Sequence, residues 1–209
     1  ETPSPIQAAC IPQLLAGHDI LGQAQTGTGK TAAFALPMLA RIDLADTRPQ
    51  VLVLTPTREL AIQVAEAFQK YAKHLPGFHV LPIYGGQSMF MQLKQLRRGV
   101  HVIVGTPGRV MDHLERKSLE LDALQALVLD EADRMLDMGF LPSMKRVLGA
   151  LPRERQTLLF SATFSAEIKA LASQFMRDPQ EIQIAKPNSV AATVTHRVHP
   201  VDQEYKRDL

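Results

Sequence analysis

The chain has 209 residues, of which 45% are hydrophobic and 21% charged, with a formal net charge of +2 and one cysteine. This is the composition of an ordinary globular protein. It argues against a membrane-spanning chain, since no apolar run approaches ~18 residues, and against an internal disulfide, since Cys10 has no partner. We expect Cys10 to be a core residue of a cytoplasmic protein. The histidines form no cluster with zinc-site spacing, so we expect no zinc. The charge permits an anionic partner without requiring one.

Strand-like and helix-like segments alternate along most of the chain. Runs such as VLVL, VIVG and LVL are apolar at every position, which is typical of parallel strands that helices cover on both faces. Strands are expected at residues 20–24, 51–55, 80–84, 100–105, 126–130, 157–161 and 181–184. Helices are expected at residues 30–41, 58–74, 88–97, 108–116, 142–151 and 166–176. The alternation predicts an α/β fold, a doubly wound, mainly parallel sheet with helices on both faces.

The last part of the chain has a different character. After Ala185 the stretch KPNSVAATVTHRVHPVDQ is polar and contains prolines, as linkers do. We therefore predict a domain over residues 1–185 and a linker over residues 186–209. The chain begins without methionine and stops where a helical pattern starts, so we expect it to be part of a longer protein.

Short polar or glycine-rich motifs follow the expected strands at their carboxyl ends. In chain order they read AQTGTGKT, TPTREL, YGGQ, GTPGR, DEAD and SAT. Functional residues of doubly wound folds gather at this edge of the sheet. These motifs are therefore the candidates for the chemistry of the chain.

The stretch AQTGTGKT joins an expected strand to an expected helix. Its glycines let backbone N–H groups converge on a phosphate, and the helix N-terminus adds partial positive charge. We expect Lys30 to reach the β- and γ-phosphates of a nucleotide, and the Thr31 hydroxyl to bind Mg²⁺. The nucleotide-binding set is Ala24, Gln25, Thr26, Gly27, Thr28, Gly29, Lys30 and Thr31. The alternative is a glycine-rich turn with a solvated lysine.

The stretch LVLDEAD places two adjacent carboxylates at the end of a buried strand. Asp130 is expected to hold Mg²⁺ partly through water, and Glu131 to orient or deprotonate an attacking water. An acidic strand end by itself is commonly a solvated turn. Beside a phosphate loop, it predicts nucleotide hydrolysis with Lys30, Asp130 and Glu131 as the catalytic residues.

Together and in this order, the motifs resemble those of the first RecA-like domain of the DEAD-box ATP-dependent RNA helicases. The resemblance covers nearly the whole chain, and it implies ATP with Mg²⁺ as nucleotide and RNA as substrate. It also implies a second RecA-like domain of the same full-length protein, toward which the linker leads. That domain would complete the hydrolytic site and allow short RNA duplexes to be unwound, whereas the isolated first domain is expected to be nearly inactive. The stretches RQTLLFSATFSAEIKALA and VTHRVHPVDQEYKRDL are similar to the RhlE-type bacterial helicases.

The resemblance also implies roles for single residues around the nucleotide. PSPIQ is similar to the family's adenine-reading motif, with Ser4 where threonine is usual, so Gln7 is expected to hydrogen-bond the adenine. The aromatic residues that usually precede this motif are absent from the chain, which leaves adenine stacking without a candidate. Ser161 and Thr163 of SAT are expected to couple the nucleotide site to the RNA site through Asp133.

A further set of residues is expected to contact the RNA backbone. These contacts would come from free backbone N–H groups, from glycines that allow the RNA to approach closely, and from arginines. Because they involve the RNA backbone, we expect little sequence specificity. The set is Pro56, Thr57, Arg58, Gly85, Gly86, Thr106, Pro107, Gly108 and Arg109. Without the resemblance, Thr57 and Thr106 are better explained as helix caps. Arg58 is alternatively a structural ion-pair partner.

Two other functions fit parts of this pattern. A DNA-directed or general P-loop ATPase shares the phosphate loop, but DEAD and PSPIQ favour the helicase. A non-catalytic RNA-binding scaffold has no need of Lys30, Thr31, Asp130 and Glu131 together. The methionine-rich stretch MLDMGF, residues 135–140, is interpreted as core packing rather than as a partner surface.

Overall fold

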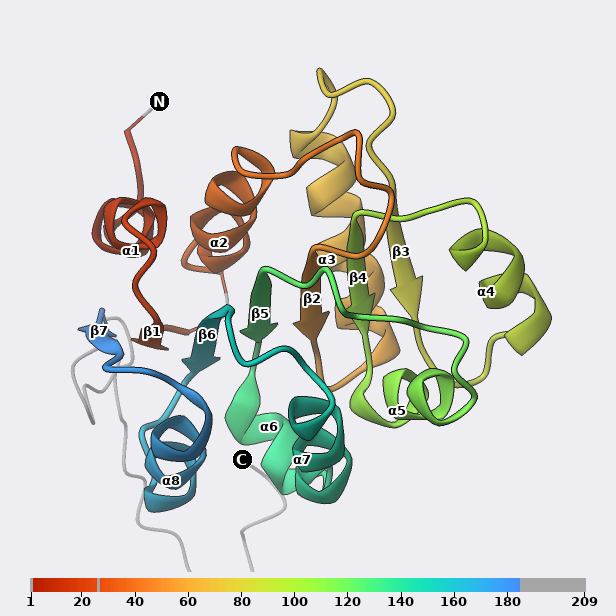
Figure 1. Cartoon of the computed structure of the whole chain (residues 1–209). Coiled ribbons are helices and arrows are strands. Elements are labelled where there is room, and N and C mark those ends of the chain that lie inside the picture. The colour runs from red at the N-terminus through yellow and green to blue at the C-terminus, as the bar shows by residue number, and fades with distance from the viewer. Residues whose placement is uncertain (1, 26, 185–209) are drawn as a thin grey trace, which may run out of the picture.

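The computed structural model describes residues 2–25 and 27–184. It contains a seven-stranded sheet between two layers of helices (Figure 1), and all neighbouring strands of this sheet are parallel. The strands are β1 (Ile20–Gln23), β2 (Val51–Leu54), β3 (Val80–Ile83), β4 (Val102–Gly105), β5 (Ala126–Leu129), β6 (Gln156–Ser161) and β7 (Gln180–Gln183). The predicted doubly wound α/β fold is confirmed, and each expected strand is present to within two residues at either end.

The helices alternate with the strands, except that α6 and α7 both lie between β5 and β6. They are α1 (Pro5–Leu15), α2 (Lys30–Leu39), α3 (Arg58–Tyr71), α4 (Met89–Leu96), α5 (Pro107–Glu115), α6 (Ala132–Asp137), α7 (Leu141–Gly149) and α8 (Ala166–Phe175). Two of them, α1 and α6, were not expected from the sequence. The linker predicted over residues 186–209 lies outside the described residues, and the domain boundary at residue 185 stays a prediction.

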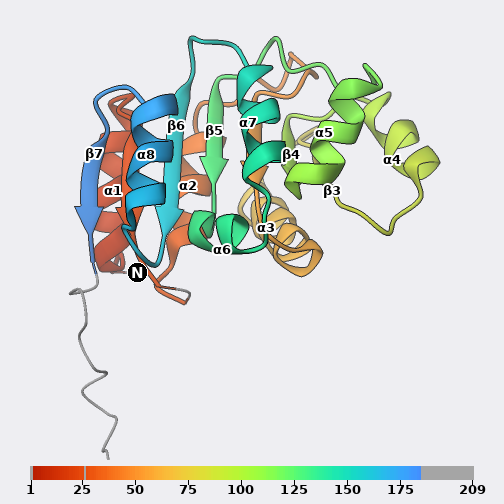
Figure 2. The same cartoon turned by 90° about the horizontal axis from the view of Figure 1, so that it is seen from below.

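Two hydrophobic cores lie on opposite faces of the sheet and explain why the central strands are apolar throughout. In β2, Val51 and Val53 point into the core beneath α1, α2 and α3, whereas Leu52 and Leu54 point into the core beneath α5 to α8. Figure 2 shows these two layers on either side of the strands. Cys10 is fully buried in the first core, as predicted, and burial raises its thiol pKa to about 12.

The strand order positions the motifs. From edge to edge the order is β3-β4-β2-β5-β6-β1-β7, so β6 lies between β5 and β1. β1 pairs with β6 on one side and with β7 on the other. The segments after β1, β6 and β5 are therefore neighbours, with the one after β6 in the middle.

The unexpected helix α6 includes the first half of the methionine-rich stretch. Met135 is fully buried and Phe140 packs against the second core, which confirms the interpretation of these residues as core. Met138 is the exception, since its side chain is exposed. Within the described residues, no helix has the length and apolar character needed to cross a membrane.

Candidate nucleotide and RNA site

The carboxyl edge of the sheet divides into two halves. The strands β3, β4 and β2 are neighbours, and the motifs GG, TPGR and PTREL follow them. The strands β5, β6 and β1 are also neighbours, and DEAD, SAT and the phosphate loop follow those. The motifs expected to bind RNA and those expected to bind nucleotide thus occupy adjacent stretches of one edge, which meet between β2 and β5.

The phosphate loop is a backbone turn that only glycine adopts easily. Gly27 and Gly29 have φ angles of 83° and 88°, in the left-handed region. A Cβ on Gly29 would come within 2.7 Å of the Gln7 Nε2 atom. Gly29 is the N-cap of α2, whose first residue is Lys30. The loop therefore leads directly into a helix N-terminus, the arrangement that favours anions, while Thr26 lies outside the described residues.

Lys30 and Asp130 form a buried ion pair between the phosphate loop and the DEAD segment. The Lys30 Nζ atom donates to the Asp130 Oδ1 atom at 3.0 Å, and the two residues are only 7% and 2% exposed. Burial raises the pKa of the Asp130 carboxyl, and the Lys30 ammonium opposes that shift. Residues 100 positions apart are thus joined by a charge-assisted bond away from water.

Glu131 has a strained backbone. Its φ and ψ are 53° and 52°, in the left-handed region that a non-glycine residue enters at a cost of about 1–3 kcal/mol. Glu131 is the N-cap of α6, and its Oε2 atom lies 3.4 Å from the Arg134 Nη1 atom. This sharp turn lets β5 end at Leu129 and α6 begin at Ala132, with only Asp130 and Glu131 between them.

Asp133 contacts the SAT segment through the backbone. Its Oδ2 atom accepts a hydrogen bond of 3.1 Å from the Ala162 N–H group. The Ser161 hydroxyl instead donates to the Thr163 carbonyl at 2.7 Å and accepts from the Thr163 N–H group at 3.2 Å. Ala162 is also held by Gln23, whose side-chain amide donates to its carbonyl at 3.0 Å. A single peptide of SAT thus contacts both the DEAD segment and β1.

An open pocket lies where these segments meet. Its volume is about 330 Å³, and its lining consists of Ala24, Lys30, Glu131, Asp133, Arg134, Asp137 and Ala162. The lining combines the end of β1, the first residue of α2 and the polar face of α6. In the part of the chain that the structure describes, no group of three or more histidine, cysteine, aspartate or glutamate side chains could hold a metal ion alone.

Gln7 joins helix α1 to the phosphate loop. Its Oε1 atom accepts from the Ser4 N–H group at 2.9 Å, and its Nε2 atom donates to the Gly29 carbonyl at 3.2 Å. The first bond belongs to the N-terminal turn of α1. Hydrogen bonds therefore hold both polar atoms of the Gln7 amide, the side chain predicted to bind adenine. One of these bonds places the amide directly against the phosphate loop.

The motifs after β2 and β4 differ in how they begin their helices. The Thr57 hydroxyl accepts from the Leu60 N–H group at 3.2 Å, so Thr57 is a helix cap. Thr106 is an N-cap without such a side-chain bond. Arg58 forms an exposed ion pair with Glu59, at 2.5 Å, that leaves its guanidinium at the surface. Of the other predicted RNA contacts, Pro56 and Pro107 are buried.

The glycines expected at the RNA site face open space. A Cβ on Gly85, Gly86 or Gly108 would meet no heavy atom within 4 Å. Gly86 has a φ of 86°, so the turn after β3 also depends on glycine for its shape. Backbone N–H groups in such open turns are accessible to a phosphate.

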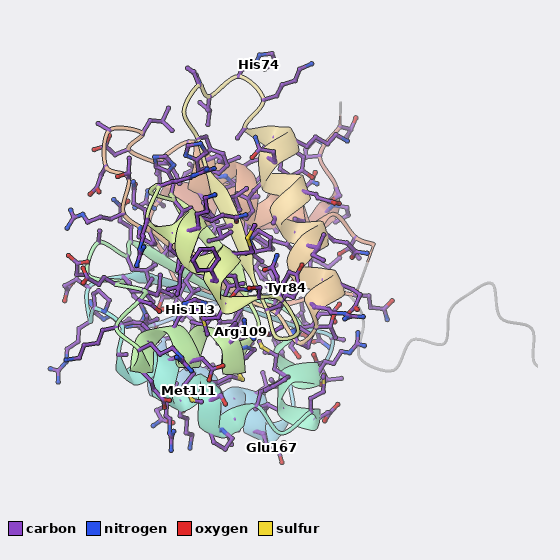
Figure 3. All side chains as sticks on the ribbon, turned by 90° about the vertical axis from the view of Figure 1, so that its right-hand side faces the viewer. His74, Tyr84, Arg109, Met111, His113 and Glu167 are labelled. Atoms are coloured by element: carbon purple, nitrogen blue, oxygen red, sulfur yellow. The ribbon has the colours of Figure 1, made fainter. Side chains whose placement is uncertain are left out.

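Arg109 lies largely inside the protein. Its side chain is 14% exposed, and its Nη1 atom donates to the Gln87 carbonyl and to the Gln92 Oε1 atom, each at 3.0 Å. Figure 3 shows Arg109 and His113 close together on α5, with Tyr84 nearby. Gln87, Gln92 and His113 are not among the residues predicted from the sequence, because a single glutamine or histidine carries no pattern that separates a buried side chain from a solvated one.

A parallel α/β sheet with a glycine-rich phosphate loop and a buried lysine–aspartate pair defines a P-loop type of nucleotide-binding domain. Residues 4–171 match the family described as DEAD/DEAH box helicase, and the chain belongs to that family. The crystal structure of a DEAD box protein from the hyperthermophile Methanococcus jannaschii superimposes with a TM-score of 0.84 at 41% identity. It covers 88% of this chain, and this chain covers 50% of it.

Several proteins named ATP-dependent RNA helicase DeaD are similar in sequence. The protein of Buchnera aphidicola subsp. Schizaphis graminum is 57% identical over 182 residues, and the Escherichia coli K12 protein is 54% identical over 184 residues. The match covers 87% and 88% of this chain but only 30% and 29% of those proteins. The chain thus spans about a third of the length of these relatives. Their names do not support the RhlE-type subgroup, which stays a prediction.

Proposed function

We propose that this chain is the ATP-binding part of the motor of an ATP-dependent RNA helicase. The observation that carries the proposal is the buried pair of Lys30 and Asp130, which brings a cation from the phosphate loop to a carboxylate from DEAD. Burying two charges costs desolvation free energy, and apolar side chains would fill the same space without that cost. It is expected where a site must bind a nucleotide phosphate and a metal ion.

The residues around the pocket fit a nucleotide triphosphate. Lys30 would exchange Asp130 for the β- and γ-phosphates, and the N–H groups of the glycine turn would bind phosphate oxygens. Thr31 and Asp130 would hold Mg²⁺, with phosphate and water oxygens completing its shell, since magnesium sites rarely consist of protein ligands alone. When bound, Mg²⁺ neutralises charge on the phosphates. Gln7 would contribute adenine recognition from the α1 side of the loop.

Glu131 is the proposed general base. Its carboxylate lines the same pocket as Lys30, where it can orient a water molecule and accept its proton. Hydrolysis would also require arginines from a second RecA-like domain of the full-length protein, which can contribute ~10³–10⁵ in rate in this class of enzyme. The peptide at Ala162, held by Asp133, is the proposed route by which the nucleotide half of the edge influences the RNA half.

RNA is proposed to bind the half of the edge that follows β3, β4 and β2. The turns at Gly85, Gly86 and Gly108 leave room for a sugar-phosphate backbone, and Arg58 is exposed beside them on α3. Closure of the second domain over this surface would bend the strand and separate a short duplex.

The test compares the chain alone with the protein extended through the following domain. We expect the chain to bind adenine nucleotide but to show negligible RNA-stimulated ATP hydrolysis and no duplex unwinding. The extended protein should gain both activities, and RNA should stimulate it far more than DNA of the same sequence. Unwinding by the isolated chain would contradict the two-domain mechanism. An extended protein that RNA does not stimulate would instead indicate a general P-loop ATPase.

A further inference from the structure

Helix α4 is attached to the protein by a buried glutamine. Gln92 is the one residue of α4 classed as buried, with 1% of its surface exposed. The apolar side chains of α4 are less buried: Phe90 is 71% exposed, Met91 is also at the surface, and Leu96 packs against the second core while only partly buried. A polar side chain in that position requires partners, because an unsatisfied buried amide is costly.

Gln92 uses all of its hydrogen-bonding capacity. Its Nε2 atom donates to the Tyr84 carbonyl at 3.1 Å and to the Gln87 Oε1 atom at 2.7 Å. Its Oε1 atom accepts from the Arg109 Nη1 atom at 3.0 Å, and the His113 Nε2 atom lies 2.8 Å away. A carbonyl on one side and a guanidinium on the other allow only one orientation of the amide. The Nε2 atom therefore faces the turn after β3, and the Oε1 atom faces α5.

This orientation also determines the state of His113. The Nε2 atom of its ring must carry a hydrogen, because it faces the Gln92 oxygen. Burial, with Arg109 nearby, lowers the His113 pKa and favours the neutral ring, while Asp112 acts in the opposite direction. The Nδ1 atom of the ring lies 2.8 Å from the Ser118 Oγ atom, and the Ser118 hydroxyl donates to the His113 carbonyl at 3.0 Å. The network thus runs from the end of α5 through Gln92 to the turn that contains Gly85 and Gly86.

Arg109 is held at the boundary between the two motifs. Both hydrogens of its Nη1 atom are used, one by the Gln87 carbonyl and one by Gln92. The Asp112 carboxylate lies 3.6 Å from its Nε atom, on the same helix. The orientation of the guanidinium is therefore set from the β3–α4 segment rather than by its own helix alone.

Building on the proposed function, we propose that Gln92 is a positioning residue of the RNA site. It holds Arg109 and the Gly85–Gly86 turn in one arrangement, so that the GG and TPGR motifs receive consecutive phosphates of a single RNA strand. Gln92 itself does not touch the RNA. Its contribution is to remove the conformational freedom of two segments that would otherwise have to become ordered when the strand binds.

The test uses the substitution Gln92→Met in the full-length protein. Methionine has a similar length and retains the packing of α4, but it forms none of the four bonds. The matched control is Gln95→Met, because Gln95 lies on the same helix and is exposed. Binding of a fluorescent oligouridylate is measured over a range of salt concentrations. ATP affinity, the RNA concentration for half-maximal ATPase stimulation and the thermal midpoint are measured alongside.

We expect Gln92→Met to weaken RNA binding about tenfold, which is the loss of one well-placed charged contact. The slope of log affinity against log salt should fall by ~0.7, since one phosphate contact is lost from a single strand. The half-stimulating RNA concentration should rise while ATP affinity and the maximal rate are unchanged. Gln95→Met should behave as wild type.

A second substitution separates positioning from helix attachment. Gln92→Glu retains acceptors for Arg109 and His113 but loses the two donors to the turn, so RNA binding should still weaken while α4 remains attached. Unchanged RNA affinity and salt slope in both Gln92 variants would overturn the inference. Equal losses of ATP binding, RNA binding and thermal stability would also overturn it in favour of a purely structural role. If the wild-type protein itself bound no RNA, the proposed function would fail instead.

Discussion

Replacing Lys30 by alanine tests whether the buried pair is as isolated from water as the structure indicates. The substitution removes the ammonium and leaves the Asp130 carboxylate 2% exposed and without its cation. Breaking a buried pair in this way typically costs about 3–5 kcal/mol. The Asp130 carboxylate can become neutral by taking up a proton, and the free energy of this protonation sets an upper limit to the loss of stability.

The limit can be calculated from the ordinary pKa of aspartate. Protonating a carboxyl of pKa ~3.9 costs about 4 kcal/mol near pH 7 and about 1.5 kcal/mol near pH 5. Without Lys30, burial raises the folded-state pKa of Asp130 above its unfolded value. Stability is then greatest below the unfolded pKa and is lost as the pH rises through the folded pKa. Near neutral pH the ceiling of about 4 kcal/mol corresponds to a fall in melting temperature of roughly 8–16 °C.

The assay is urea unfolding of the chain at neutral and mildly acidic pH, without nucleotide. We expect Lys30→Ala to be much less stable than wild type near pH 7 and to recover part of the loss near pH 5. The double variant Lys30→Ala/Asp130→Asn should lack this pH dependence, and Lys70→Ala, at an exposed lysine of α3, should change little. Wild-type stability of Lys30→Ala at neutral pH would refute the reasoning, because the carboxylate would then be hydrated.

Three further predictions concern single side chains. Glu131→Gln should retain nucleotide binding in the protein extended through the second domain, but it should hydrolyse ATP ~10²–10⁴-fold more slowly, as expected for a lost general base; a steady-state assay with near-normal turnover would place the base elsewhere. Gln7→Ala should narrow the preference for ATP over GTP in competition titrations, because an amide matches the donor and acceptor of adenine; equal competition in the wild type would refute the adenine assignment. Cys10 should resist alkylation at mildly alkaline pH until the chain unfolds, since burial raises its pKa to about 12; rapid labelling of the native chain would show that the first core opens readily.

The strands and the motifs at their ends were predictable because they depend on local sequence. Runs of apolar residues in the central strands reflect burial on two faces, and that pattern is visible without knowing what covers them. Helix α1 was missed because it contains Pro5 and Pro12 and has little amphipathic contrast. A sign of it was present in Ile6, Cys10 and Leu14, which recur every four residues and are all buried.

The contacts within the site were not predictable, since they join residues that are distant in the chain. Nothing in the sequence distinguishes Gln92, buried on α4, from Gln95, exposed on the same helix. Asp133 was expected to act through the hydroxyls of SAT, whereas its hydrogen bond to that segment comes from the backbone N–H group of Ala162. A backbone donor carries no residue identity, so sequence patterns cannot indicate which peptide will be used.

The position of β1 has a consequence for how the protein is synthesised. β1 emerges from the ribosome well before its two neighbours in the sheet, β6 and β7, which end at Ser161 and Gln183. The strand must therefore remain unpaired until β6, which begins at Gln156, has been translated. Pairing over such long separations is slow and leaves apolar edges exposed to aggregation. Nucleotide binding would accordingly appear as one of the last events of folding. The unpaired ILGQ segment is the part of the nascent chain that a chaperone would be expected to protect from aggregation.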